Sequence, residues 1–302
     1  SKNVSERFCA VTRMRHLSVV VLTFNCEGTI RKCLESIFNA KKAFDIDEVV
    51  VVDGGSKDKT LKIVGEFPTK IVANVKGRGP SREAGWREAR NDLVCFFDSD
   101  LYLDPDWFVE IAKAMDKYPD ADVWYGRVYT WNEDNLVAKM SGIEYSYYYD
   151  RIKGEGSINR YSTDTSNTVF RKSVLEKVNG FDTTLPYSED AEIGHRIWRA
   201  GGKIVLWHEA KVYHYHRPSL RAKIKQNVEF GMGTAYILDK NPDYPQPWLM
   251  YALLPYSIAK LALVLGRRHG WVGVATALLY FVKRVSFLYG YLKARIMGLK
   301  MR

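Results

Sequence analysis

The chain has 302 residues, of which 46% are apolar and 26% charged, and its net charge is +10. This length and apolar content suit one large α/β domain with an appendage, and they exclude an intrinsically disordered protein. The four cysteines, Cys9, Cys26, Cys33 and Cys95, lack the paired spacing of a zinc site and are too few for a disulfide framework, which indicates a reducing, cytoplasmic environment.

The N-terminal third begins with a polar segment and then alternates strands with helices. Residues 1–16 lack the apolar run of a secretory signal, so we expect a tail. The β-branched run Leu17–Thr23 predicts a strand, and the apolar spacing over Glu27–Phe38 predicts a helix. A second buried strand is predicted at Glu48–Val52, after which Ser56 is expected to cap a helix that starts near residue 57.

The next segments continue this alternation. We predict a short strand at Ile71–Val75, a helix at Ser81–Asn91 and a strand at Leu93–Phe97 that runs directly into Asp98. Alternating strands and helices predict an α/β fold with a mostly parallel central sheet and flanking helices. Further along we expect a strand at Val123–Trp131, a segment Tyr161–Phe170 leading into a helix at Lys172–Val178, a helix at Glu189–Ala200, an extended segment at Lys203–Tyr213, and mainly helix after Leu220.

Three of the predicted strands are followed directly by polar residues. These are Thr23-Phe24-Asn25, Asp53-Gly54-Gly55 and Asp98-Ser99-Asp100. Ligands of open α/β sheets bind beyond the carboxyl ends of the strands, so we expect a ligand crevice there.

Asp98 and Asp100 place two carboxylates beside each other at the end of the very apolar strand LVCFF. Such a pair is costly unless a cation or hydrogen bonds offset the repulsion. Mg²⁺ or Mn²⁺ held by these oxygens would neutralise a diphosphate leaving group. An isolated Asp-x-Asp triplet is more often a solvated turn, and its place after a buried strand favours the metal site.

The C-terminal segment is basic and apolar. Residues 211–302 hold 15 Lys and Arg against three acidic residues, a net charge of +12. The apolar runs Trp248–Leu265 and Trp271–Leu292 suit an anionic membrane surface, or alternatively a helical subdomain or dimer interface with a solvated basic face. Because lysine and arginine interrupt both runs, we expect interfacial helices and not spanning ones. Nucleic-acid binding is disfavoured, since the charge accompanies long apolar runs.

Four ordered blocks give a more specific indication. They are VVVLTFNCEGTIRKCLESI, EVVVVDGGSKDKT, FFDSD with the downstream DPDWF, and SEDAEIGHRIWRAGGKI followed by VYHYHRPSL. In these blocks the chain resembles the large family 2 of glycosyltransferases, whose nucleotide-binding domain has the GT-A fold. The resemblance implies a catalytic domain over residues 17–220. The basic, apolar region over residues 221–302 follows from composition alone, and neither the segment before Leu17 nor the tail after Asp243 resembles the family.

The first two blocks imply a nucleotide site. By resemblance, Thr23, Phe24 and Asn25 line the base and ribose pocket with Glu27 close by, and Asp53 hydrogen-bonds the base or ribose. The alternative is that the first residues only end a strand and that Asp53 only closes a turn.

The third block and the basic loop before it imply the diphosphate site. By resemblance, Asp98 and Ser99 also contact the donor, and Arg82, chosen over Arg78, faces the nucleotide. A basic loop that runs into a helix N-terminus favours a nearby phosphate, although a solvated loop would look the same. Arg217 is within reach of the same diphosphate.

The fourth block implies which residues carry out the reaction. By resemblance, Asp190 is the general base of an inverting enzyme, and Glu189 orients Asp190 or contacts the acceptor. Alternatively, both are acidic residues that stabilise a helix N-terminus. His214 and His216 point to the same side of an extended segment, and the resemblance implies that His214 completes the metal site.

The sequence therefore predicts an inverting glycosyltransferase that uses Mn²⁺ or Mg²⁺. It would transfer a sugar from a UDP- or GDP-linked donor to a hydroxyl of a glycan or lipid-linked acceptor, at the cytoplasmic face of a membrane. A sugar-nucleotide nucleotidyltransferase is disfavoured, because Phe24-Asn25-Cys26-Glu27 is not a glycine-rich basic loop. A catalytically silent nucleotide-sugar or membrane-binding scaffold is disfavoured because all the expected acidic residues are present.

Overall fold

A computed structural model of the chain describes residues 15–152, 157–158, 164–246, 251 and 253–297. Its strands are β1 (Arg15–Thr23), β2 (Phe44–Asp53), β3 (Lys70–Val72), β4 (Leu93–Asp98), β5 (Leu101–Leu103), β6 (Val123–Thr130), β7 (Ser157–Ile158), β8 (Asn167–Arg171) and β9 (Ile204–His214). Its helices are α1 (Ile30–Asn39), α2 (Thr60–Val64), α3 (Arg78–Glu88), α4 (Trp107–Lys117), α5 (Leu136–Tyr149), α6 (Lys172–Lys177), α7 (Glu189–Arg199), α8 (Leu220–Lys240) and α10 (Leu254–Ile296).

In the described part of the chain the strands form one nine-stranded sheet, in the order β3-β2-β1-β4-β8-β6-β9-β5, with β7 paired to β9. The first four strands are all parallel, as the alternation of strands and helices predicted. Strand β8 runs antiparallel to both β4 and β6, and β5 runs antiparallel to β9. The sheet is therefore mixed: strands β1 to β4 are parallel to one another, and a second parallel pair, β6 and β9, lies among antiparallel pairs.

The core of this sheet consists of strands that are covered on both faces. The residues Val19–Val21 of β1 and Val50–Val52 of β2 are fully buried. Helix α1 buries Ile30, Cys33, Leu34 and Ile37, a spacing that places them on one face of a helix. Long runs of buried β-branched residues are typical of parallel strands, which have helices on both sides.

The structure corrects three local predictions. Strand β1 begins at Arg15, so the tail ends before residue 15, and residues 1–14 lie outside the described part of the chain. Ser56 does not cap a helix: its hydroxyl donates to Asp53 Oδ1, and α2 begins only at Thr60. Helix α3 begins at Arg78, three residues before the predicted start, because the chain turns at Gly77, whose φ is +100°.

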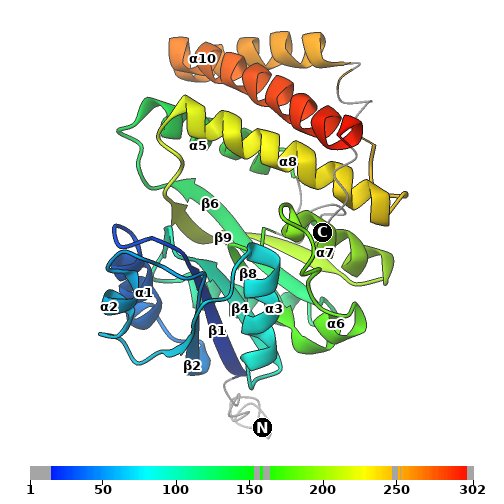
Figure 1. Cartoon of the computed structure of the whole chain (residues 1–302). Helices are drawn as coiled ribbons and strands as arrows, with labels where there is room; N and C mark the ends of the chain where they lie inside the picture. Colours follow the sequence, from blue (N-terminus) through cyan, green and yellow to red (C-terminus); the bar gives the residue numbers. More distant parts are fainter. Residues whose placement is uncertain (1–14, 153–156, 159–163, 247–250, 252, 298–302) are drawn as a thin grey trace, which may run out of the picture.

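Helices α5, α8 and α10 form a separate layer across one end of the sheet (Figure 1). Gly270 has non-helical backbone angles, φ 59° and ψ −140°, and divides α10 into two helices that fold back on each other. Part of the first predicted apolar run, residues 247–250 and 252, lies outside the described residues. The second half of α10 packs along α8 through a cluster that includes Ala235, Leu238, Tyr291 and Ala294.

Gly290 lets α8 and α10 approach closely, because a Cβ at this position would lie 2.0 Å from the backbone oxygen of Val228. We expect Gly290→Ala to lower the free energy of unfolding by about 1–3 kcal/mol, the usual cost of overpacking, which exceeds the helix propensity that alanine gains. Chemical denaturation measures this. Gly65→Ala is the control, since a Cβ there would meet only ordinary contacts of 3.5 Å or more. Equal stability of the two variants would contradict the close packing of α8 on α10.

Candidate functional site

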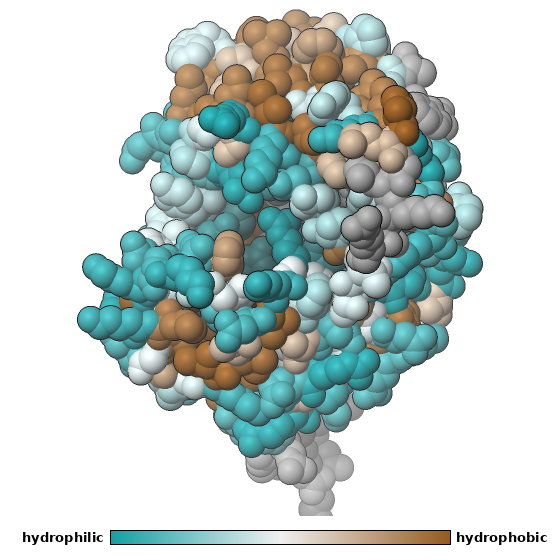
Figure 2. All heavy atoms as spheres, viewed as in Figure 1, coloured by the Kyte–Doolittle hydropathy of each residue, from teal (hydrophilic) through white to brown (hydrophobic). Residues whose placement is uncertain are grey.

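One pocket lies between the end of the sheet and the C-terminal helices. Figure 2 shows the hollow on this face, bordered mainly by hydrophilic residues. It is lined by residues from the sheet domain and from α8: Arg78, Arg82, Asp98, Asp100, Val128, Tyr145, Asp164, Thr165, Ser166, Glu189, Asp190, His214, His216, Arg217, Lys223, Gln226 and Phe230. Seven of the residues predicted from the sequence therefore meet in one place. The lining also crosses the domain boundary that the sequence predicted at residue 220.

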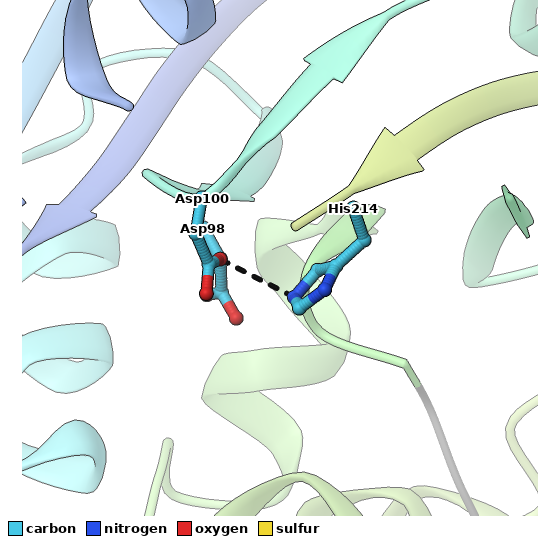
Figure 3. Close-up of side chains that lie close together, drawn as sticks. All are labelled: Asp98, Asp100 and His214. Atoms are coloured by element: carbon cyan, nitrogen blue, oxygen red, sulfur yellow. Dashed lines mark ion pairs between the residues drawn. The ribbon is translucent and has the colours of Figure 1, made fainter. Parts of the chain in front are cut away.

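Asp98, Asp100 and His214 form a compact cluster in this pocket. Asp98 ends β4, Asp100 precedes β5, and the pairing of Leu101 with His214 brings the end of β9 beside them. The Nε2 atom of His214 lies 3.2 Å from Asp100 Oδ1, and the three ligand atoms lie within 4.8 Å of one another. In Figure 3 the two carboxylates lie side by side and the imidazole points toward them.

The chemistry of this cluster fits a divalent cation. Carboxylate oxygens are the ligands that Mg²⁺ and Mn²⁺ prefer, and imidazole is a common additional ligand. Burial acts to raise the pKa of Asp100, but the charge and hydrogen bond of His214 outweigh it and hold this pKa at about 2. Conversely, Asp100 raises the pKa of His214 although burial acts to lower it. The carboxylates thus stabilise positive charge at the point where a metal ion would bind.

Arg82 connects the metal cluster to the acidic pair. Its side chain is 4% exposed, and its two terminal nitrogens lie 3.0 Å from Asp98 Oδ1 and 3.1 Å from Glu189 Oε1. Both ends of the guanidinium are therefore engaged by carboxylates. Arg78, one helical turn earlier, is exposed and lines the same pocket. The predicted contact of Arg82 with the nucleotide stays a prediction, and Arg78 is the guanidinium that is open to a ligand.

Glu189 and Asp190 form the first turn of α7. They follow Ser188, whose φ of +62° is unusual for a residue other than glycine and directs the helix start into the pocket. Glu189 is 3% exposed and fixed by Arg82. Burial and the neighbouring charge of Glu189 raise the pKa of Asp190 to about 7. A carboxylate with a pKa near neutrality is suited to accept a proton at physiological pH.

The loops after β1 and β2 are tied to each other. Asn25 accepts a hydrogen bond from the Lys57 backbone at 2.8 Å, and Glu27 accepts one from the Lys59 backbone at 2.9 Å. Asp53 is fully buried and accepts hydrogen bonds from Thr23 and from the Gly55 and Ser56 backbone. These contacts show Asp53 closing the loop, the alternative role considered above, and its contact with a base or ribose stays a prediction.

Two other predicted donor contacts differ in their exposure. Phe24 is 62% exposed and packs over Gly54, where a Cβ would lie 3.1 Å from its ring. It therefore presents an open aromatic face beside these loops. Ser99 is 8% exposed and is not part of the pocket lining. Of the residues in the Asp-x-Asp triplet, only the two aspartates reach the pocket.

Several pocket residues have no motif that marks them in the sequence. Lys223, Gln226 and Phe230 lie on one face of α8 at helical spacing and close the pocket from above. Their sequence pattern indicates only a basic, apolar helical segment. Asp164 precedes β8 and hydrogen-bonds Ser166, and no motif marked it. His216 is 3% exposed, and burial lowers its pKa to about 2, so it is a neutral neighbour of His214.

Comparisons with known proteins identify the family of this chain and its fold. The sequence profile described as Glycosyl transferase family 2 matches residues 18–178. A dolichyl N-acetyl-alpha-D-glucosaminyl phosphate 3-beta-D-2,3-diacetamido-2,3-dideoxy-beta-D-glucuronosyltransferase of Methanococcus voltae is 26% identical over 245 residues, 75% of each chain. The probable glycosyltransferase YdaM of Bacillus subtilis is 24% identical over 239 residues, 74% of this chain and 56% of the relative.

Solved structures agree at the level of the fold. The mannosyltransferase PcManGT of Pyrobaculum calidifontis, in complex with GDP-Man and Mn²⁺, has a TM-score of 0.66 at 15% identity and covers 96% of this chain and 89% of its own. Residues 1–349 of Staphylococcus aureus TarS, in complex with UDP-GlcNAc, have a TM-score of 0.55 at 18% identity, with coverages of 96% and 93%. The chain therefore belongs to glycosyl transferase family 2, has the GT-A fold and is a glycosyltransferase.

Proposed function

We propose that the protein is an inverting, metal-dependent glycosyltransferase that moves a sugar from a nucleoside-diphosphate donor to an acceptor hydroxyl. The observation that carries this proposal is the meeting of the Asp98, Asp100 and His214 cluster with Asp190 in one pocket. The relatives support the donor class, since PcManGT binds GDP-Man and TarS binds UDP-GlcNAc.

In this proposal Asp190 accepts the proton of the acceptor hydroxyl while the hydroxyl oxygen forms a bond to the anomeric carbon. The bond from this carbon to the donor phosphate oxygen breaks, and the nucleoside diphosphate leaves with the bonding electrons. Attack from the side opposite the leaving group inverts the configuration. Glu189, fixed by Arg82 at 3.1 Å, keeps the first turn of α7 in place, so that Asp190 faces the pocket.

A divalent ion bound by Asp98, Asp100 and His214 would supply positive charge for the developing diphosphate. Arg78 is the protein group that adds to this charge, because it lines the pocket and lies close enough to the four acidic residues Asp98, Asp100, Glu189 and Asp190 for their charge to raise its pKa. Transition-state charge is stabilised most by groups that are already oriented before the reaction. Arg82 forms salt bridges with Asp98 and Glu189 and so fixes the orientation of both carboxylates before the reaction.

A donor screen tests the proposal. The protein is incubated with UDP-, GDP-, CDP- and dTDP-sugars, with Mn²⁺ or with EDTA, and its melting temperature and the release of nucleotide are measured. A bound donor raises the melting temperature, because it binds only the native state. We expect one donor to give both a shift and a slow metal-dependent hydrolysis. No shift and no hydrolysis with any sugar nucleotide would contradict the proposal.

We further propose that α10 holds the protein on the cytoplasmic face of a membrane, where it meets a lipid-linked acceptor. The second half of α10 exposes an outer stripe of apolar residues at helical spacing: Trp271, Val274, Leu278, Phe281, Val285, Tyr289, Leu292 and Ile296. Figure 2 shows this apolar surface across the C-terminal layer. An extended apolar face on a soluble protein indicates a partner surface.

Two basic side chains of α10 point away from this apolar stripe, toward other helices. Lys283 binds both carboxylate oxygens of Glu144 on α5, at 2.8 and 2.7 Å, and Arg295 pairs with Asp239 on α8. Arg267 and Arg268 are exposed at the hairpin turn, where they suit anionic headgroups. The ion pairs hold Lys283 and Arg295 toward α5 and α8 and away from the outer stripe.

Length and composition alone would allow α10 to cross a bilayer: it has 43 residues and a most apolar window with a mean hydropathy of 1.4. Two features support a helix that lies in the interface. Gly270 breaks α10 into a hairpin, and the second half packs lengthwise against α8. One side of the helix is thus covered by protein, and only the outer stripe is available to lipid.

We expect Leu278→Glu to weaken binding to anionic liposomes by about tenfold or more, since the loss of one buried apolar side chain costs about 1.5–3 kcal/mol. Leu278 is 60% exposed, so the fold should not change. Co-sedimentation measures the binding. Ile71→Glu is the matched control, because Ile71 is also exposed, at 42%, but lies on the edge strand β3. Equal binding of both variants would exclude the outer stripe as the membrane contact.

A further inference from the structure

Lys223 is a buried cation without a paired anion. It is 4% exposed on the first turn of α8 and lines the pocket. Within the described residues its ammonium group makes no hydrogen bond or ion pair, whereas its backbone N–H donates to Ser219 and its backbone oxygen accepts from the Asn227 side chain. Burial of a lysine without a counter-charge is costly. Burial, with the charge of Lys283, lowers the pKa of Lys223 to about 8.

The surroundings of Lys223 carry more positive than available negative charge. The side chains whose charges shift the pKa of Lys223 are Lys283, Glu144, Arg217 and Asp100. Lys283 is already neutralised by Glu144, which binds it through both carboxylate oxygens. Asp100 belongs to the metal cluster, so a bound metal ion would balance its negative charge. Among the residues that the structure describes, no further anion then pairs with Lys223 or with the exposed Arg217.

The position of Lys223 separates it from the donor side of the pocket. The arginines Arg78 and Arg82 come from α3 in the sheet domain, beside Asp98. Lys223 comes from α8, and the charges of Asp100 in the metal cluster and of the Lys283–Glu144 pair, which joins α10 to α5, all act on it. An anion bound here would therefore reach the pocket from the side of the membrane-facing hairpin.

We propose that Lys223, together with Arg217, binds the phosphate group of a lipid-linked acceptor and so holds the acceptor beside Asp190. This inference rests on the proposed function, and it adds the acceptor class and the residues that recognise it. An ammonium and a guanidinium are the two side chains that proteins use most for phosphate. The apolar rest of such an acceptor would extend toward α10.

Binding of farnesyl phosphate and of farnesol to the full chain, loaded with Mn²⁺ and with UDP or GDP, tests this inference. Calorimetry in detergent micelles gives both affinities. We expect the wild type to bind farnesyl phosphate at least about tenfold more tightly than farnesol, since charge-assisted contacts to phosphate are strong. Lys223→Met should abolish most of this difference, while its affinity for the nucleotide changes by less than about twofold.

Lys225→Met is the matched control. Lys225 lies on the same helix but points outward, with its side chain 79% exposed and only a 3.9 Å contact to Glu229. Both substitutions remove one positive charge, so a general electrostatic effect would lower both affinities equally. Lys223→Met should fold well because it removes a desolvated charge, and Lys223→Gln provides a second variant. Lys223→Arg should retain most of the preference for the phosphate.

Other roles of Lys223 predict different outcomes of these binding measurements. A fall in nucleotide affinity of about tenfold or more in Lys223→Met would make Lys223 a donor ligand and overturn the inference. Unchanged farnesyl phosphate binding in this variant would overturn it as well. Competition by inorganic phosphate alone, with no advantage of farnesyl phosphate over it, would show a site for free phosphate and would also overturn the lipid-linked acceptor. If the wild type bound no nucleotide, the proposed function would fail, whereas the farnesyl phosphate measurement would still report on Lys223.

Discussion

Asp190→Asn is expected to lower kcat by about 10² to 10⁴, the usual contribution of a general base. The substitution preserves the shape of the side chain and most of its hydrogen bonding, including the contact of Oδ1 with the Ala191 backbone, but it removes the ability to accept a proton. The affinity for the donor should barely change, because the base acts only on the incoming hydroxyl in the transition state. Steady-state kinetics and calorimetry separate the two quantities.

The pH dependence of the wild type provides an independent check of the same residue. Since Asp190 must be ionised to accept a proton and its pKa is raised to about 7, kcat/KM should rise with pH and level off above neutrality. Asp190→Asn should lose this limb of the profile. Asp116→Asn is the control, because Asp116 is exposed on α4 and does not line the pocket.

Two results would exclude Asp190 as the base. One is a wild-type rate of transfer by Asp190→Asn. The other is a product with the same anomeric configuration as the donor, as shown by NMR, because a single displacement inverts the carbon. Either result would leave the metal cluster intact but would require another residue of the pocket for the chemistry.

Asp100→Ala is expected to abolish metal-stimulated binding of the donor. The variant loses one of the two carboxylates, and His214 loses the partner that lies 3.2 Å from its Nε2. Loss of an outer-shell partner of a metal ligand typically costs about 10- to 100-fold in affinity, so the loss of a ligand should cost at least as much. Calorimetry with the nucleotide diphosphate, in Mn²⁺ and in EDTA, measures the difference.

Asp106→Ala is the control for this second prediction. Asp106 is a surface aspartate close in sequence, which pairs with Lys41 and does not line the pocket. It should bind metal and nucleotide like the wild type. If Asp100→Ala retained the full stimulation by Mn²⁺, the cluster of Asp98, Asp100 and His214 would not be the metal site.

Much of the site was predictable because it lies where strands end. The apolar runs that form β1, β2 and β4 are local signals, and a parallel arrangement brings their carboxyl ends to one edge of the sheet. Asp98 and Asp100 could therefore be placed in the crevice before the structure was known. Alternation along an extended strand placed His214 and His216 on the same side, and only the resemblance to family 2 singled out His214.

The C-terminal layer was predictable only in composition. The sequence showed a basic and apolar segment, but whether Lys283 faces lipid or protein depends on Glu144, which is 139 residues away. Gly270 provides the positive φ of the turn locally, but the packing of α10 against α5 and α8 is a tertiary feature. A sequence pattern shows which face of a helix is apolar, but it does not show which element packs against that face.

The amino-acid sequence by itself determined the parallel strands β1 to β4, the residues that carry charge at the edge of the sheet and, through the resemblance to family 2, the GT-A fold. Only the tertiary structure decided how these charges are connected: Arg82 lies between Asp98 and Glu189, and Lys223 closes the pocket from α8. The reason is physical. Secondary structure follows from the local pattern of apolar residues, whereas the pKa of Asp190 and the missing anion at Lys223 depend on burial by segments distant in the chain.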